Sequence, residues 1–169
     1  MLVRKTRVEE IDDVIGIIRQ NIAYFKEVGI DQWQHGYPNR ETIVEDVAKG
    51  ISYVLVEDDQ VLGTCVIIFT EEPTYKVMIE GEWLNDEPYG TIHRIAMDPK
   101  VKGRGLANYF YEYAKALAIE QGIYNLRVDT HKDNKSMQAW IKKCGFEYTG
   151  IIRVKDGLRK SFHNCFRKI

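Results

Sequence analysis

Two glycines separated by one residue, Gly103 and Gly105, stand between a short β-rich run and a run with helical periodicity. A strand that turns through such glycines into a helix directs several unpaired backbone N–H groups toward one point, which suits an anion. Glycine is favoured there because a side chain would hold a phosphate away from the backbone, and because it adopts positive φ readily. The stretch therefore predicts a strand, turn and helix unit that binds a phosphorylated ligand.

Composition limits the classes of protein that this chain can belong to. Its 169 residues are the size of one ordinary domain, so we expect a single domain over residues 1–169. The net charge of -1 with interspersed acids and bases provides no basic stripe, so we expect neither nucleic acid nor membrane as a partner. Three widely spaced cysteines without a CxxC pair indicate no disulfide framework and no metal site.

The chain also lacks sequence features of export and membrane insertion. The N-terminal segment has no apolar core of the signal-peptide kind, and no later run approaches the roughly 20 apolar residues of a membrane span. We therefore expect a soluble protein, and the cysteine pattern favours a reducing cytoplasm.

Hydrophobic periodicity predicts the element order β-α-α-β-β-β-α-β-α-β-β. Residues 71–88 are predicted to be irregular. The predicted strands cover residues 2–7, 51–69 as a hairpin, 91–97, 125–130, 148–154 and 159–169, and the predicted helices cover 11–28, 40–47, 106–121 and 134–145.

Other phosphate-binding motifs fit the glycine turn less well. A P-loop requires GxxxxGK[ST], which is absent from the sequence. A dinucleotide-binding fingerprint requires GxGxxG, but Asn108 occupies the third glycine position. Asp129 lies at a suitable distance for a ribose contact, yet no βαβ unit precedes the turn. A dinucleotide-binding protein therefore stays a disfavoured alternative.

The stretch "KGRGLA" resembles the [QR]-x-x-G-x-[GA] signature of the GNAT N-acetyltransferases. The preceding "RIAMDP" and the later "NKSMQAWIKKCGF", an Asn opening a helix that ends in Gly-Phe, are also similar to that family. The longer pattern resembles a bacterial branch of it. The resemblance covers essentially the whole chain and implies an α/β (α+β) fold, with a central mixed, mostly antiparallel twisted sheet flanked by about four helices.

The resemblance also implies a co-substrate, a reaction and the residues that serve them. Acetyl-CoA would donate its acetyl group to a primary amine, on a small molecule or a peptide, by direct attack in a ternary complex. The strand edge would receive the pantetheine arm, and the N–H of Ala96 or Met97 would bind the carbonyl oxygen. The residues implied in cofactor binding are Ile95, Ala96, Met97, Lys102, Gly103, Arg104, Gly105, Leu106, Ala107 and Asn134.

His93 is our candidate for the base that takes the amine proton. Regular strand alternation would put it on the same face as Ile95 and Met97, and imidazole titrates near neutrality. The alternative is a structural histidine in a buried strand. Glu80 and Glu82 are rival bases, while His131 is more consistent with a turn before Asn134, and His35 could touch the acceptor.

The general acid and the acceptor stay open. Many GNAT members have a Tyr four residues before the Gly of Gly-Phe, where this chain has Ile141, so its role passes to water, another residue or nothing. A non-catalytic CoA-binding regulator or sensor is therefore the alternative function.

Other side chains complete the sequence-based interpretation. Trp33, Tyr37 and Trp83 are candidates to line the acceptor cleft or to pack under loops, and Cys144 is expected to pack. A highly acidic cleft is not evident from the sequence, and a homodimer is compatible with this interpretation.

Overall fold

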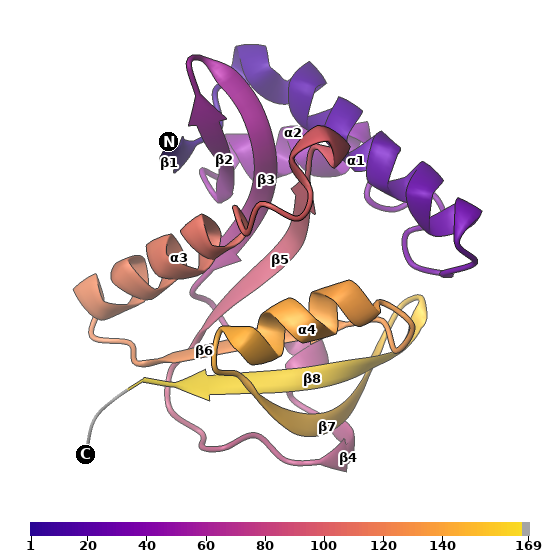
Figure 1. Cartoon of the computed structure of the whole chain (residues 1–169). Helices are drawn as coiled ribbons and strands as arrows, with labels where there is room; N and C mark the ends of the chain where they lie inside the picture. The colour runs from indigo at the N-terminus through magenta and orange to yellow at the C-terminus, as the bar shows by residue number, and fades with distance from the viewer. Residues whose placement is uncertain (167–169) are drawn as a thin grey trace. The chain divides into compact units, whose positions relative to one another are not determined.

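The computed structural model describes residues 1–166, which contain eight strands and four α-helices (Figure 1). The strands are β1 Leu2–Lys5, β2 Ser52–Glu57, β3 Gln60–Ile68, β4 Met78–Gly81, β5 Gly90–Met97, β6 Asn125–Thr130, β7 Glu147–Val154 and β8 Gly157–Cys165. The helices are α1 Ile11–Glu27, α2 Arg40–Ala48, α3 Asn108–Glu120 and α4 Lys135–Lys143. Among these residues, no helix is long and apolar enough to span a membrane.

One sheet contains all eight strands in the order β1-β2-β3-β5-β6-β8-β7-β4. The pairs β1–β2, β2–β3, β6–β8, β7–β8 and β4–β7 are antiparallel, whereas β5 and β6 run parallel and pair Gly90 with Leu126 and Thr91 with Arg127. The expected mixed, mostly antiparallel sheet with four helices is confirmed.

One predicted segment was wrong. Residues 71–88, expected to be irregular, contain strand β4 and a short 3-10 helix, Pro73–Tyr75. The sequence "MIEG" of β4 is too short to show alternation, and the segment becomes a strand because it pairs with β7. The last predicted strand, 159–169, ends in the structure at Cys165, and its residues 167–169 lie outside the described part.

The chain divides into two compact units, of which the first comprises residues 1–67 and 93–113. Its core joins one face of α1 to α2, β2, β3 and β5, because α1 repeats apolar residues at helical spacing. Asn39 caps α2, since its side chain accepts from the Thr42 N–H at 3.0 Å. The buried members of this core are Ile11, Val14, Ile15, Ile17, Ile18, Ile43, Val54, Val56, Val61 and Ala96.

The second unit comprises residues 68–92 and the described residues from 114 onward. Here the sequence of β6, "NLRVDT", alternates polar and apolar side chains, and Leu126 and Val128 are buried. The polar face of β6 is also covered: Arg127 is only 5% exposed, and the segment that includes Trp83 and Asn85 contacts it. The polar half of an amphipathic strand is thus internal.

A buried histidine forms part of this polar face. His163, on β8, pairs in register with Arg127, and its Nδ1 accepts from the Leu84 N–H at 3.1 Å. Its Nε2 lies 2.8 Å from Oδ1 of Asn125, so Nε2 carries the proton of a neutral ring. Burial first, and then the positive charge of Arg127, lower the pKa of His163 to about 4.

We predict that this histidine makes the protein sensitive to mild acid. The unfolded chain binds a proton at His163 near pH 6.5 but the folded chain only near pH 4, so this stability is present above about pH 6.5 and is lost as pH falls toward about 4. Between about pH 7 and about pH 5 the free energy of unfolding should fall by about 2 kcal/mol. Urea titrations at both values measure it.

The exposed His35 supplies the control for this prediction, since its side chain is 53% accessible. Replacing His163 by Gln should flatten the acid-side slope, whereas His35→Gln should keep it. An equal slope in the wild type and in His163→Gln would contradict the assignment.

Candidate functional site

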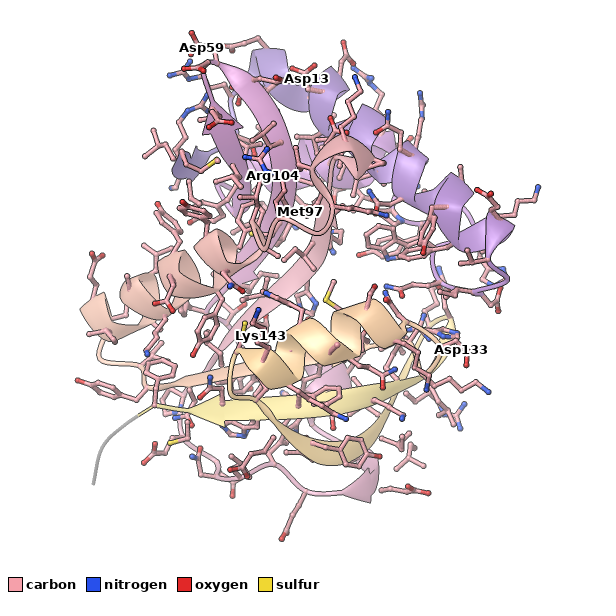
Figure 2. All side chains as sticks on the ribbon, viewed as in Figure 1. Asp13, Asp59, Met97, Arg104, Asp133 and Lys143 are labelled. Atoms are coloured by element: carbon pink, nitrogen blue, oxygen red, sulfur yellow. The ribbon has the colours of Figure 1, made fainter. Side chains whose placement is uncertain are left out.

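The turn between β5 and α3 is fixed at both of its ends. Asp98 follows β5, donates its N–H to the Leu62 carbonyl at 2.8 Å, and accepts from the Lys100 N–H on its side chain at 2.9 Å. Val101 and Leu106 are both buried, each 8% exposed. The four residues between them, 102–105, are exposed. The turn is therefore an anchored loop with an open middle, where Arg104 is labelled (Figure 2).

Both glycines of this turn have the backbone conformation that the sequence suggested. Gly103 has φ 83° and Gly105 has φ 70°, in the left-handed region that side chains disfavour. A Cβ built at either position would meet no atom within 4 Å. The backbone is consequently bare on that side, with room for a ligand to approach it.

Four backbone donors lie in or next to this bare stretch. Within residues 1–166, the N–H groups of Gly103, Gly105, Leu106 and Ala107 donate no hydrogen bond. The first N–H inside α3, that of Asn108, already bonds to the Gly105 carbonyl at 3.3 Å. These donors and the positive end of a 13-residue helix dipole together form an anion-binding geometry.

Two cationic side chains of the turn differ in their surroundings. Arg104 is exposed, whereas the ammonium of Lys102 lies 4.0 Å from the ring centroid of Tyr24 on α1, a cation–π contact. Desolvation in this position lowers the pKa of Lys102. Lys102 thus has a definite place beside α1 and retains one positive charge near the turn.

The carboxyl end of β5 is held by a residue that sequence reasoning missed. Asn21, 6% exposed on α1, donates from Nδ2 to the Met97 carbonyl at 3.0 Å and to the Ile17 carbonyl at 2.9 Å. A polar residue on the apolar face of α1 was the available signal. Ala96 is buried in the core, and Met97 contacts Gly63, where a Cβ would lie 2.6 Å from the methionine sulfur.

Strand β5 is not regularly pleated, contrary to the alternation assumed for His93, Ile95 and Met97. Arg94 has φ 50°, a left-handed conformation in the middle of the strand. Simple alternation therefore does not determine the direction of His93. The His93 side chain is half-buried, and its role stays a prediction.

Of the two aromatic candidates in the first unit, Trp33 packs against the core and Tyr37 is exposed. Trp33 is half-buried, packs against the core and meets Phe25 edge-to-face at 5.6 Å, which supports the packing alternative. Tyr37 is 44% exposed and its hydroxyl accepts a hydrogen bond from Arg94. His35 lies on the same loop and pairs with Asp31 at 3.2 Å.

Three further candidates belong to the second unit. Asn134 is buried and caps α4, since its side chain accepts from the Met137 N–H at 3.2 Å. His131 is a turn residue, as expected, because its Nδ1 accepts from the Asp133 N–H at 3.1 Å. Trp83 donates from its indole to the Tyr75 carbonyl at 2.8 Å and packs against the Tyr75 ring.

The remaining second-unit candidates are less constrained or purely structural. Glu80 and Glu82 are exposed. Ile141 is 1% exposed and belongs to the core, so it contributes packing alone. Cys144 is half-buried rather than fully packed and lies at the C-terminal cap of α4.

An acidic depression of about 540 Å³ lies on the first unit, which the sequence did not indicate. Asp13 on α1 and Asp59 at the turn between β2 and β3 border it and are labelled in Figure 2. Its other acidic lining residues are Asp12, Asp58 and Asp98. These aspartates come from three separate parts of the chain. The sequence therefore did not indicate that they lie together.

Comparisons with known proteins agree with this fold. The family model described as the acetyltransferase (GNAT) family matches residues 20–146. A GNAT-family acetyltransferase structure from Streptococcus agalactiae is 34% identical, with a TM-score of 0.89 over 99% of this chain and 96% of that one. The PaiA N-acetyltransferase of Thermoplasma acidophilum in complex with coenzyme A has a TM-score of 0.73 at 13% identity, over 98% of both chains.

A curated relative is a streptothricin acetyltransferase from Escherichia coli. It is 26% identical over 100 residues, which are 59% of this chain and 56% of that protein. The match therefore spans little more than half the length of either protein.

Proposed function

Because the chain belongs to the GNAT acetyltransferase family, we propose that it transfers the acetyl group of acetyl-CoA to a primary amine by direct attack in a ternary complex. The observation that carries the proposal is the glycine turn with four N–H groups that donate no hydrogen bond within residues 1–166. A single GNAT domain over residues 1–169 is part of the proposal.

The residues of the turn fit a pyrophosphate. Gly103 and Gly105 leave the backbone bare, the free N–H groups provide donors, and Lys102 and Arg104 provide positive charge. We assign cofactor binding to residues 102–107, to the strand edge Ile95–Met97 and to Asn134. Among residues 1–166 no group of three or more His, Cys, Asp or Glu side chains is arranged so that it could hold a metal ion.

Acetyl-CoA supplies a thioester carbonyl that accepts the amine and a thiol that leaves. An amine of the lysine kind has a pKa of about 10.4, so presenting it neutral near pH 7 costs about 4 to 5 kcal/mol unless a base removes its proton. We assign that base to His93, with Glu80 and Glu82 as rivals. The N–H of Ala96 or Met97 would donate to the carbonyl oxygen as it gains negative charge.

The acceptor is proposed to be a small molecule or a peptide with a primary amine. The streptothricin acetyltransferase relative supports the small-molecule class. Trp33, Tyr37 and Trp83 are kept as acceptor contacts, with Tyr37 best supported because it is exposed. Ile141 cannot donate a proton, so water or another residue would protonate the leaving thiolate.

The same observation on Ile141 supports the alternative function, a CoA-binding regulator or sensor without turnover. Release of free thiol from acetyl-CoA in the presence of a panel of amines distinguishes the two functions, because binding alone releases none. Amine-dependent thiol release would support the transferase, and binding without release would support the sensor.

We predict that acetyl-CoA stabilises the fold, whereas NAD does not. Ligand at about 100 times Kd adds about 2.7 kcal/mol to the free energy of unfolding, which a thermal melt detects. Replacing Gly105 by Val should abolish this shift, because a β-branched side chain blocks the approach to the backbone and resists positive φ.

Gly122 offers a matched control for this variant. It follows α3, has φ 72° and has open space around a built Cβ, as Gly105 does. Gly122→Val should carry a similar backbone strain yet keep the acetyl-CoA shift. Normal acetyl-CoA binding by a folded Gly105→Val protein would contradict the anion site.

We also predict that His93→Ala lowers kcat by about 10²- to 10⁴-fold, the range of a lost general base, with little change in acetyl-CoA affinity. Part of the rate should return at high pH, because alkali deprotonates the amine without help. A structural histidine would instead give a loss that pH does not repair. An unchanged kcat and pH profile would transfer the role to Glu80, Glu82 or water, which Glu80→Gln and Glu82→Gln test.

A further inference from the structure

The left-handed backbone of Arg94 is the least expected feature of β5. A residue other than glycine at φ 50° inside a strand is strained, and it persists only where the surrounding structure enforces it. Arg94 directly follows His93 and directly precedes Ile95 in the strand whose edge carries the proposed carbonyl donor. The strain is therefore located in the strand that the proposed reaction uses.

The side chain of Arg94 forms a buried ion pair. The guanidinium of Arg94 donates through Nε and a terminal nitrogen to the two carboxylate oxygens of Asp46, at 2.9 Å and 2.7 Å. Asp46 lies on α2 and its side chain is 6% exposed, while that of Arg94 is 14% exposed. A bidentate pair of this kind fixes both the position and the orientation of the guanidinium.

The same guanidinium also contacts the loop before α2. Its other terminal nitrogen donates to the Tyr37 hydroxyl, and its carbon lies 5.8 Å from the centroid of the Tyr37 ring. Helix α2 is itself fixed, because Asn39 caps it and Ile43 is buried in the core. One side chain of β5 is thus held by a fixed helix and by the loop that carries a proposed acceptor contact.

We propose that Asp46 is a positioning residue for acetyl transfer: through Arg94 it holds the bend of β5, and so sets the direction of the Ala96 and Met97 N–H groups. The proposal rests on the proposed function, since it assigns a role to that same strand. Asp46 itself touches no reacting atom. Its effect should appear in the rate of transfer and only weakly in acetyl-CoA binding, because the turn at residues 102–107 has its own anchors.

Glycine provides a sharp test, because it adopts positive φ without strain and without a side-chain partner. Asp46→Asn removes the charge at nearly constant volume and should lower kcat about tenfold or more, as small misplacements of catalytic groups do. The double variant Asp46→Asn, Arg94→Gly should recover most of the lost kcat, since a glycine at this position of β5 keeps the bend unaided. Arg94→Gly also removes the guanidinium that Asp46→Asn leaves unpaired. The control is therefore the double variant Asp46→Asn, Arg94→Ala, which removes the same charge but disfavours positive φ and should stay impaired.

The pair between Asp12 and Arg40 provides the matched control. It also joins an aspartate to an arginine across two elements, at 2.7 Å, but both side chains are exposed. Asp12→Asn should leave kcat unchanged. Thermal melts with acetyl-CoA on every variant should show a preserved ligand shift.

Amide chemical shifts of Ala96 and Met97 provide a measurement that does not depend on turnover. They should move in Asp46→Asn and return toward wild-type values in the double variant with Arg94→Gly. If the wild-type protein released no thiol, the proposed function would fail while these shifts still decided the positioning role.

Two outcomes would overturn the proposal. One is a wild-type kcat, or wild-type amide shifts, in Asp46→Asn. The other is a double variant with Arg94→Gly that performs no better than the single variant or the Arg94→Ala control. If Asp46→Asn alone does not fold, the double variant with Arg94→Gly decides, because it should fold and should show near-wild-type kcat and amide shifts.

Discussion

Within residues 1–166, the turn after β5 keeps several backbone N–H groups unpaired while the chain on both sides of it is held firmly. A buried, unsatisfied N–H group is costly, and two of the unpaired donors, those of Gly103 and Gly105, lie on exposed residues of the turn. The hydrogen bonds of Asp98 and Asn21, and the buried side chains of Val101 and Leu106, hold that turn without occupying its donors. Contacts from α1, β3 and the turn itself thus hold this short stretch in place.

The second unit differs because it buries charged and polar side chains, which lose their contact with water. Arg127 lies 4.0 Å from the ring centroid of Tyr89 and 4.5 Å from that of Trp83, so two π faces replace part of its water. His163 remains neutral beside it and accepts and donates one hydrogen bond each. Burial disfavours the protonated ring, and a proton there would also place two buried positive charges together, so the pKa of His163 is lowered.

The sequence predicted those features that local chemistry specifies. The glycines at 103 and 105 indicated positive φ, Asn134 was expected at the start of its helix, and Ile141 showed that the usual general acid of the family is absent. Strand β4 was missed because four residues carry too little pattern. The bend at Arg94 was missed because nothing about an arginine in a strand indicates φ 50°.

The sequence by itself determined the bare glycine turn and the order of the helices and of every strand except β4, because both depend on periodicity and on the steric freedom of glycine, which act between near neighbours in the chain. The fold class followed from the resemblance to the GNAT family. Only the tertiary structure decided which polar groups are buried and which partners they meet. Asp46 and Arg94 are 48 residues apart, and Asn21 and Met97 are 76 apart. Such pairs form only when separate elements pack together, and the burial that strengthens them is a property of the folded chain.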